Sequence, residues 1–487
     1  MDPLANAAPN YFELLPSEVK TQIAGYVDDS SLRKVSKDFR ESTDNALKDV
    51  WRGWKNTLPE DAPLRMVMKP YFYSKDSEGS IGHFEHVTRA IESIWNKEKS
   101  NLQPEFVERL EARIPICSNV DAIELLNEGI LSTNKSNNSL FSFWSLLNTQ
   151  FKVQNIDLSG STLPSTASEL RSWFKDPKNQ QYLDKITELN FLTEIPEEIG
   201  YLKNLKIISA KTEGLPQEIA KLEHLESLTF RNTATIKVLP TVIFDCKSLK
   251  SLNLSNNQIT VLPEEIGQLE NLQELNLSLN SLSILPQEIF NLRKLRKFDL
   301  YGNAITQIPS EIEKLSQLTI LYLVDNQISQ LPRTFGSLSN LKSLNLSGNP
   351  LNQLPPFLGN LSELIYLKCD DTHIQTIPAN IRLLQNLTHL SLANNQISEI
   401  PKEILYLQKL QNLDLDTNQL TTLPDEMRHL NALKILNVIN NPLSSLPPHL
   451  SETPIEALYY LGTMIPASDT AFIRKRGLDY FGYPLTL

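Results

Sequence analysis

Cysteine is scarce in this 487-residue sequence, which contains only Cys117, Cys246 and Cys369. Three cysteines that lie far apart do not make a disulfide framework, and they fit a reducing compartment. The sequence also lacks any run of about 18 apolar residues, the minimum for a membrane-spanning helix. Its first residues, MDPLANAAPNYFELLP, have neither the basic nor the apolar region of a secretory signal peptide. We therefore expect a cytoplasmic protein with no membrane partner.

An excess of basic residues is missing as well. The sequence has 46 Lys and Arg against 57 Asp and Glu, which gives a formal net charge of −11. Nucleic acid and anionic lipid both require a dense basic surface, so neither is expected as a partner. The hydrophobic content of 40% is enough for a large core. The length fits either a few domains or one long repeat array.

Motifs for catalysis, cofactors and metals are missing too. The sequence contains no Walker A sequence, no kinase motif set and no local Ser/His/Asp motif. His83 and His86, in HFEH, could approach a metal ion, but they have no cysteine or carboxylate partners at ligand spacing. We therefore expect no metal, no cofactor and no catalytic residue.

What the sequence has in abundance is a repeat with the pattern LxxLxLxxNxLxxLPxxIxxL. Its first leucine is Leu249, and the leucine recurs every 23 residues up to Leu433. Less regular units begin upstream at Ile186, Leu205 and Leu225. The segment QNIDLSGSTL, residues 154–163, is interpreted as a degenerate first unit, followed by a polar break at about 165–182. We assign residues 151–450 to the array, with regular units from about residue 247.

The pattern of each unit predicts its backbone. The LxLxx stretch alternates with period two, which predicts a short strand with inward leucines in a parallel sheet. Asparagine at the ninth position can donate and accept hydrogen bonds where the strand ends. Thr372 occupies that position in one unit, so we expect its turn to be the weakest. The Leu-Pro or Ile-Pro pair that follows blocks further strand pairing. The pattern resembles the leucine-rich repeat family, which implies an α/β solenoid with a parallel β-sheet horseshoe.

Each unit would expose its third, fifth and seventh residues on the concave face of the sheet. The candidate target-binding residues at these positions are Asp299, Tyr301, Tyr322, Val324, Tyr366, Lys368 and Asp370. Tyrosine is enriched in binding hot spots, which favours a site for a target protein. The alternative interpretation is a lateral stack of side chains that only stabilises the sheet.

Residues 11–54 carry a second pattern, for which we expect three short helices. It begins with Leu-Pro-x-Glu and ends near a tryptophan, and it comprises Leu15, Pro16, Glu18, Ile23, Tyr26, Val27, Asp28, Leu32, Val35, Ser36, Lys37, Phe39, Arg40 and Trp51. This pattern resembles an F-box, which docks on the Skp-type adaptor of cullin–RING ubiquitin ligases. The resemblance implies that the adaptor-facing residues are Leu15, Pro16, Ile23, Leu32, Val35 and Trp51.

Leu-Pro repeats joined to an F-box-like segment resemble effectors of intracellular bacteria that recruit the host SCF ubiquitin ligase. The resemblance implies a substrate receptor in the host cytosol, which binds the adaptor through the F-box and a target through the concave face. The alternative is a non-catalytic scaffold or inhibitor without a ubiquitin link. An autonomous ligase using the Cys369-Asp370-Asp371 motif is disfavoured, because Cys369 takes a core position that holds Leu or Val in the neighbouring units.

The remaining segments are expected to connect and cap the array. Residues 1–10 are assigned to a flexible tail, residues 55–150 to a helical linker and N-terminal cap, and residues 451–487 to a C-terminal cap. Within the linker, EFVERLEARI (105–114) and VDAIELLNEGIL (120–131) are expected to be helices and STNKSNNS (132–139) a polar loop. The apolar SLFSFWSLLNTQF (139–151) is expected to cover the first strands. Outside a complex we expect a monomer.

Overall fold

The computed structural model describes residues 119–158, 164–191, 194–211, 214–230, 237 and 239–466. The chain divides into two compact units, residues 1–138 and 139–487. The tail at 1–10, the F-box-like segment at 11–54 and the helix expected at 105–114 lie outside the described residues. Within the described part of the chain, no helix is long and apolar enough to cross a membrane.

A single helix, α6, spans Asn119–Val153. The helix expected at 120–131 is therefore confirmed, whereas the polar loop expected at 132–139 is wrong, because those residues continue the helix. Serine, threonine and asparagine each cost at most about 0.7 kcal/mol in a helix relative to alanine. The segment contains neither the proline nor the glycine that would break the helix, so its polar composition alone does not end it.

The last turns of α6 pack on the beginning of the repeats. Residues spaced three or four apart on one side of the helix are buried, and they are Leu140, Phe143, Leu147 and Phe151. The Phe143 ring lies 5.7 Å from the ring of Phe191 in the first strand and 5.5 Å from Phe174. The apolar stretch 139–151 thus covers the first strand, as expected.

Two further α-helices and a short 3-10 helix follow at this end of the array. Helix α7 spans Ala167–Lys175, the 3-10 helix η2 spans Pro177–Asn179 and α8 spans Gln180–Leu183. A capping box begins α7: the Thr166 hydroxyl accepts from the Glu169 N–H at 3.2 Å, and the Glu169 carboxylate accepts from the Thr166 N–H at 3.2 Å. The stretch interpreted as a polar break is therefore a helical cap.

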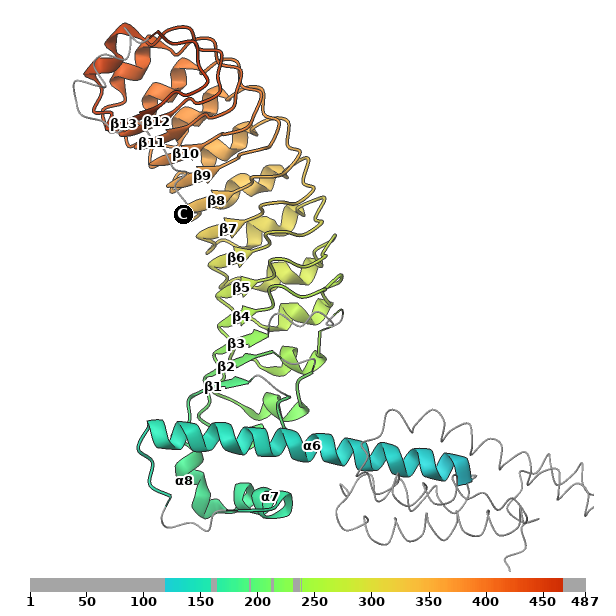
Figure 1. Ribbon diagram of the computed structural model, residues 1–487. Coiled ribbons are helices and arrows are strands. Elements are labelled where there is room, and N and C mark those ends of the chain that lie inside the picture. The colour runs from blue at the N-terminus through green and yellow to red at the C-terminus, as the bar shows by residue number, and fades with distance from the viewer. Residues whose placement is uncertain are drawn as a thin grey trace, which may run out of the picture. The chain divides into compact units, whose positions relative to one another are not determined.

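The repeats form one parallel sheet of thirteen strands in sequence order, stacked along one side of the array (Figure 1). The strands are β1 Glu188–Phe191, β2 Ile207–Ala210, β3 Ser227–Phe230, β4 Ser251–Asn253, β5 Glu274–Asn276, β6 Lys297–Asp299, β7 Ile320–Tyr322, β8 Ser343–Asn345, β9 Tyr366–Lys368, β10 His389–Ser391, β11 Asn412–Asp414, β12 Ile435–Asn437 and β13 Ala457–Tyr459. The expected parallel solenoid is confirmed.

The opposite side of the array is formed by short 3-10 helices (Figure 1). They are η3 Glu197–Tyr201, η4 Gln217–Lys221, η5 Thr241–Asp245, η6 Glu264–Gln268, η7 Gln287–Asn291, η8 Ser310–Lys314, η9 Arg333–Ser337, η10 Pro356–Asn360, η11 Ala379–Leu383, η12 Lys402–Tyr406, η13 Asp425–His429 and η14 Pro448–Glu452. Each follows a proline, as in Pro263 before η6. The Leu-Pro or Ile-Pro pair therefore marks where the chain leaves the sheet and begins a helical turn.

The asparagines at the ninth position join each unit to the one before it. Asn349 Nδ2 donates to the carbonyl oxygens of Leu323 and Leu346, at 2.8 and 2.9 Å, and its Oδ1 accepts from the Ile328 N–H at 3.0 Å. Asn349 is 1% exposed. Its amide thus satisfies backbone groups in two successive units that have left the strand ladder, as the sequence predicted.

The two ends of the array differ from the expected boundaries. Residues 151–153 belong to α6, and residues 156–158, the described part of the supposed first unit after that helix, form no strand. The sheet begins instead at Glu188, in the unit of Ile186. At the other end, β13 extends the array beyond residue 450 and pairs in parallel with β12. The part of the expected C-terminal cap that is described is therefore one more repeat.

Candidate functional site

We call the exposed side of the sheet, made of the third, fifth and seventh residues of each unit, the strand face. The parallel register aligns equivalent residues across it, so that Asp299, Tyr322, Asn345 and Lys368 follow one another on β6 to β9. All seven predicted target-binding residues belong to this face, on the units of β6, β7 and β9. The unit of β8 separates them with the smaller side chains of Ser343, Asn345 and Ser347.

The predicted tyrosines differ in their surroundings. Tyr301 and Tyr366 are 38% and 42% exposed, and Tyr322 is half-buried. The Tyr366 ring stacks on His389 of β10 at a centroid distance of 4.5 Å. Burial lowers the pKa of His389, which favours the neutral ring. Tyr366 thus forms the lateral stack of the alternative interpretation and still presents much of its ring to a partner.

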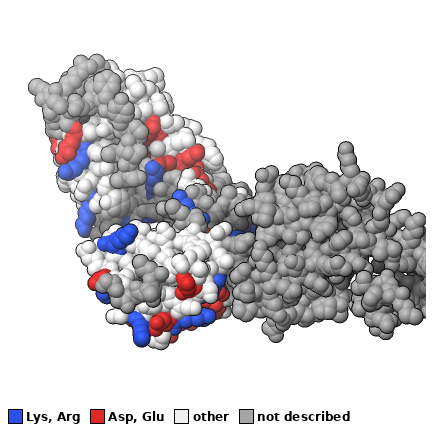
Figure 2. All heavy atoms as spheres, turned by 60° about the horizontal axis from the view of Figure 1, so that its bottom comes forward, with Lys and Arg blue, Asp and Glu red and all other residues white. Residues whose placement is uncertain are grey.

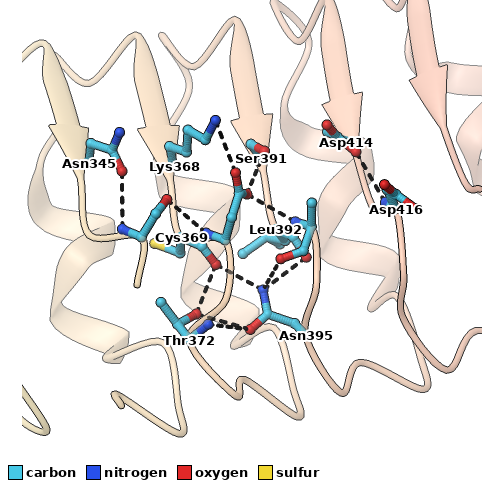
Figure 3. Close-up of polar contacts among 12 residues, drawn as sticks. Asn345, Lys368, Cys369, Thr372, Ser391, Leu392, Asn395, Asp414 and Asp416 are labelled. Carbon is cyan, nitrogen blue, oxygen red and sulfur yellow. Dashed lines mark hydrogen bonds and ion pairs between the residues drawn. The ribbon is translucent and has the colours of Figure 1, made fainter. Parts of the chain in front are cut away.

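A polar network fixes Asp370 at the end of β9 (Figure 3). Its carboxylate accepts from Ser391 Oγ at 2.6 Å and from the Ala393 N–H at 3.0 Å, both in the next unit. Lys368 Nζ lies 3.1 Å from the second carboxylate oxygen. On the other side, the Asp370 N–H donates to Ser347 Oγ at 3.0 Å. Asp370 is therefore held in one orientation by three successive units.

Two other carboxylates on the strand face carry an electrostatic penalty. Burial raises the pKa of Asp414, and the negative charges of Asp370 and Asp416 raise it further. Burial also raises the pKa of Asp299. Each accepts one backbone hydrogen bond, from the N–H of Asp416 and of Tyr301 respectively, at 3.1 Å. The partial burial of these carboxylates disfavours their charged forms, so a positively charged group of a partner would be attracted to them.

Ser391, His389 and Asp414 were not among the predicted site residues. Their repeat positions place them on the strand face, so the sequence did contain a signal for their exposure. Their contacts with Asp370 and Tyr366 depend on the register between neighbouring units, which the sequence of a single unit does not reveal.

Cys369 lies in the core and not on the strand face. It is 0% exposed, and burial raises the pKa of its thiol far above the ordinary value. Cys246 is also buried, and burial raises the pKa of its thiol to about 12. A buried thiol with a raised pKa is a poor nucleophile. The Cys369-Asp370-Asp371 motif therefore presents no accessible thiolate.

Charged residues are interspersed with uncharged ones on the surface shown in Figure 2. The described lysines and arginines on this view alternate with acidic residues and form no continuous basic patch. In the described residues there is also no group of three or more His, Cys, Asp and Glu residues that could hold a metal ion.

Comparisons with known proteins agree with this architecture. A family model described as a leucine-rich repeat region matches residues 288–365 and 352–452, and one described as a leucine rich repeat matches residues 223–282 and 247–305. A solved leucine-rich repeat protein of Leptospira interrogans is 31% identical, with 62% of this chain and 90% of that chain covered and a TM-score of 0.54. The chain belongs to the leucine-rich repeat proteins.

An internalin of Listeria monocytogenes has the same fold at 22% identity, with 64% of this chain and 94% of that chain covered and a TM-score of 0.55. No curated protein sequence matches the chain. The family models match leucine-rich repeats from residue 223 onward, so the F-box resemblance of residues 11–54 rests on its own motif. Taken by itself, the repeat array is a protein-interaction scaffold of the leucine-rich repeat type.

Proposed function

We propose that the strand face around β6 to β9 binds a protein target. The observation that carries this proposal is the exposure of large aromatic rings, Tyr301 and Tyr366, on a sheet whose other side is filled by leucine. Neither the strand pairing nor the core requires a tyrosine at these positions. Truncating a tyrosine at the centre of an interface often costs about 2 kcal/mol or more of binding free energy.

The polar groups beside the tyrosines are already held in place in the unbound protein. Asp370 is already bound by Ser391, Ala393 and Lys368, so little side-chain entropy remains to be lost there. Such preorganisation lowers the free-energy cost of association. A rigid sheet with exposed aromatics and fixed charges suits a folded or extended protein partner better than a small molecule.

We further propose that residues 11–54 act as an F-box, so that the chain is a substrate receptor of a cullin–RING ubiquitin ligase. This proposal is supported by the ordered motif from Leu15 to Trp51. The chain would then contribute no chemistry of its own and would hold the target close to a recruited ubiquitin-transfer enzyme. The same architecture supports the proposal of a bacterial effector that acts in the host cytosol.

A pair of double variants tests the two halves of the proposal separately. In a pull-down with the purified Skp-type adaptor, Leu15→Ala/Pro16→Ala should abolish adaptor binding, while Tyr322→Ala/Tyr366→Ala should leave it intact. Absence of adaptor binding by the unmodified protein would reject the F-box. The alternative, a scaffold or inhibitor without a ubiquitin link, predicts that outcome together with retained target binding.

Target binding is measured with a candidate captured from host-cell lysate and then purified. Tyr322→Ala/Tyr366→Ala should weaken its affinity, and Leu15→Ala/Pro16→Ala should not. The control on the opposite side of the array is Glu264→Gln/Glu265→Gln, at the start of η6. If this control weakened binding as much as the tyrosine variant, the strand face would not be the binding surface.

A further inference from the structure

The last five strands expose an acidic part of the strand face. At the end of β9 and β11 lie the carboxylates of Asp370, Asp414 and Asp416, and Asp371 follows Asp370 in the turn beside this face. Lys368 is the basic residue among them, and it pairs with Asp370. Within the described residues, Asp414 and Asp416 form no ion pair. A surface that keeps carboxylates close together, with only one of them neutralised, is complementary to a cationic segment.

Apolar side chains continue this surface toward the end of the array. Ile435, Ile439 and Tyr459 are half-buried on the units of β12 and β13. Leu461 and Met464, just after β13, are 78% and 67% exposed. The Met464 N–H donates to the Leu443 carbonyl at 2.9 Å, as equivalent residues do between the preceding repeats, so the chain is still held against the array at residue 464. The acidic residues on the unit of β11 and these apolar residues on the units of β12 and β13 therefore occupy neighbouring units of the array.

The sequence that follows complements both kinds of group. Residues 467–487, which lie outside the described residues, read ASDTAFIRKRGLDYFGYPLTL. Arg474, Lys475 and Arg476 form the only run of three consecutive basic residues in the sequence. Phe472 and Ile473 precede this run, and tyrosine and phenylalanine follow it. One short segment thus offers cations flanked by apolar side chains.

The tether is long enough to bring the basic run to the carboxylates. Seven residues lie between Pro466 and Arg474, so eight residue-to-residue steps join them. An extended chain spans at most about 3.3–3.6 Å per step, or about 27 Å in all. Two strand spacings separate β13 from β11, which is about 10 Å. Because the segment is attached to the same chain, its effective concentration at the strand face is in the millimolar range.

We propose that residues 467–487 bind back onto the strand face of β9 to β13, with Arg474–Arg476 against Asp414 and Asp416. The segment would occupy part of the surface that binds the target and would compete with it. This inference rests on the proposed target-binding function of the strand face. The raised pKa of Asp414 supports it, because a neighbouring cation would offset the cost of keeping that carboxylate charged.

Zero-length carbodiimide crosslinking of the full chain tests the proposal without a target. It joins lysine amines to carboxylates in direct contact, and mass spectrometry locates the links. We expect Lys475 to be linked to Asp414, Asp416, Asp370 or Asp371. Mixing ¹⁴N- and ¹⁵N-labelled protein distinguishes links within one chain from links between copies. Links only between copies, or no link from Lys475 to these four residues, would overturn the proposal.

A matched pair of variants checks the electrostatic origin of the contact. Asp414→Asn/Asp416→Asn should reduce the remaining links from Lys475 to Asp370 and Asp371 about fivefold or more. Glu264→Gln/Glu265→Gln removes two acidic charges at η6 and should leave those links unchanged. Equal yields in the two variants would contradict the assignment.

Competition between residues 467–487 and a target for the strand face is tested in a separate experiment, which requires a purified target. Arg474→Glu/Lys475→Glu/Arg476→Glu should raise the affinity for a strand-face target about threefold or more. Unchanged affinity would refute the competition. Failure of the crosslinking alone would leave the proposed target binding intact, because no target takes part in that experiment.

Discussion

Replacing Asn395 with alanine should destabilise the array more than the same change at Asn418, one repeat further along. Asn395 Oδ1 accepts from two backbone N–H groups, those of Ile374 at 2.9 Å and Thr372 at 3.2 Å. Asn418 Oδ1 accepts from one, that of Ile397 at 3.0 Å. The difference arises because Thr372, which takes the place of an asparagine, turns its N–H toward the amide of the following unit (Figure 3).

The size of each loss of stability depends on how many backbone groups would lose their only hydrogen-bond partner. The three carbonyls bound by Asn395 each keep another donor: Cys369 O keeps Thr372 Oγ1 at 2.8 Å, Leu392 O keeps Asn418 Nδ2 at 2.9 Å, and Ala393 O keeps the Asp371 N–H at 3.0 Å. The penalty therefore comes from the N–H groups. Each buried, unsatisfied N–H costs about 1–3 kcal/mol, so Asn418→Ala should lower the free energy of unfolding by about 1–3 kcal/mol and Asn395→Ala by about 2–6 kcal/mol.

Chemical denaturation followed by circular dichroism measures these two losses. Hydrogen exchange of peptides covering residues 369–374 adds a local measurement, because repeat arrays do not always unfold as one unit. Asn412→Ala, on the strand face of β11, serves as a control and should change stability by no more than about 0.5 kcal/mol. Equal losses at Asn395 and Asn418 would refute the reasoning, since they would mean that the Thr372 N–H does not depend on the Asn395 amide.

Three further predictions concern the same region. Thr372→Asn should raise the free energy of unfolding by about 0.5–1.5 kcal/mol and slow hydrogen exchange in its turn, because an amide can bond both neighbouring units. Tyr366→Ala should weaken target binding about tenfold or more while lowering stability by less than about 1.5 kcal/mol; a large fall in Tm with unchanged affinity would make the ring structural. Asp414→Asn should stabilise the protein slightly, by less than about 1 kcal/mol, at pH 7–8. The folded-state pKa of Asp414 is raised, so the contribution of this carboxyl group to the free energy of unfolding is present below its unfolded-state pKa. That contribution is lost as the pH rises through the folded-state pKa. The benefit of Asp414→Asn should therefore vanish in acid, and a benefit that persists in denaturation curves below pH 3 would contradict the assigned cause.

The interior of the array could be predicted because each structural position has its own residue type. Leucine and isoleucine at fixed spacing identified the strands, and the ninth-position asparagine identified the turns. The last repeat was missed because this signal changes there: Thr463 stands at the ninth position and donates its hydroxyl to Tyr460 O at 2.7 Å. Thr372 makes the same bond to Cys369 O. Threonine can thus satisfy the carbonyl of its own unit, although it lacks the second donor with which asparagine reaches the preceding one.

The N-terminal end was harder to predict for a different reason. The polar composition of residues 132–139 indicated a loop, but continuation of α6 depends on the absence of a helix breaker and on packing at Leu140, Phe143 and Leu147. The segment at 156–158 has the apolar alternation of a strand, yet it forms none, and at this end of the sheet Phe143 of α6 packs on Phe191 of β1. Local pattern identified the apolar residues correctly, while tertiary packing decided which of them became strands.

In the candidate site, too, the exposure of a residue could be predicted from its position in one unit, whereas its electrostatic surroundings depend on the packing of neighbouring units. The exposure of Asp414 on the strand face could be read from its repeat position, but the cost of its charge comes first from burial in the stack and then from the negative charges of Asp370, two units away, and Asp416. A carboxylate that is held near another negative charge destabilises the isolated array, and a cation supplied by a partner or by Arg474–Arg476 would offset that cost. Asp414→Asn should therefore stabilise the Arg474→Glu/Lys475→Glu/Arg476→Glu variant more than it stabilises the unmodified chain. Equal effects in the two backgrounds would show that the basic run does not reach Asp414, and would leave an external target as the source of the compensating charge.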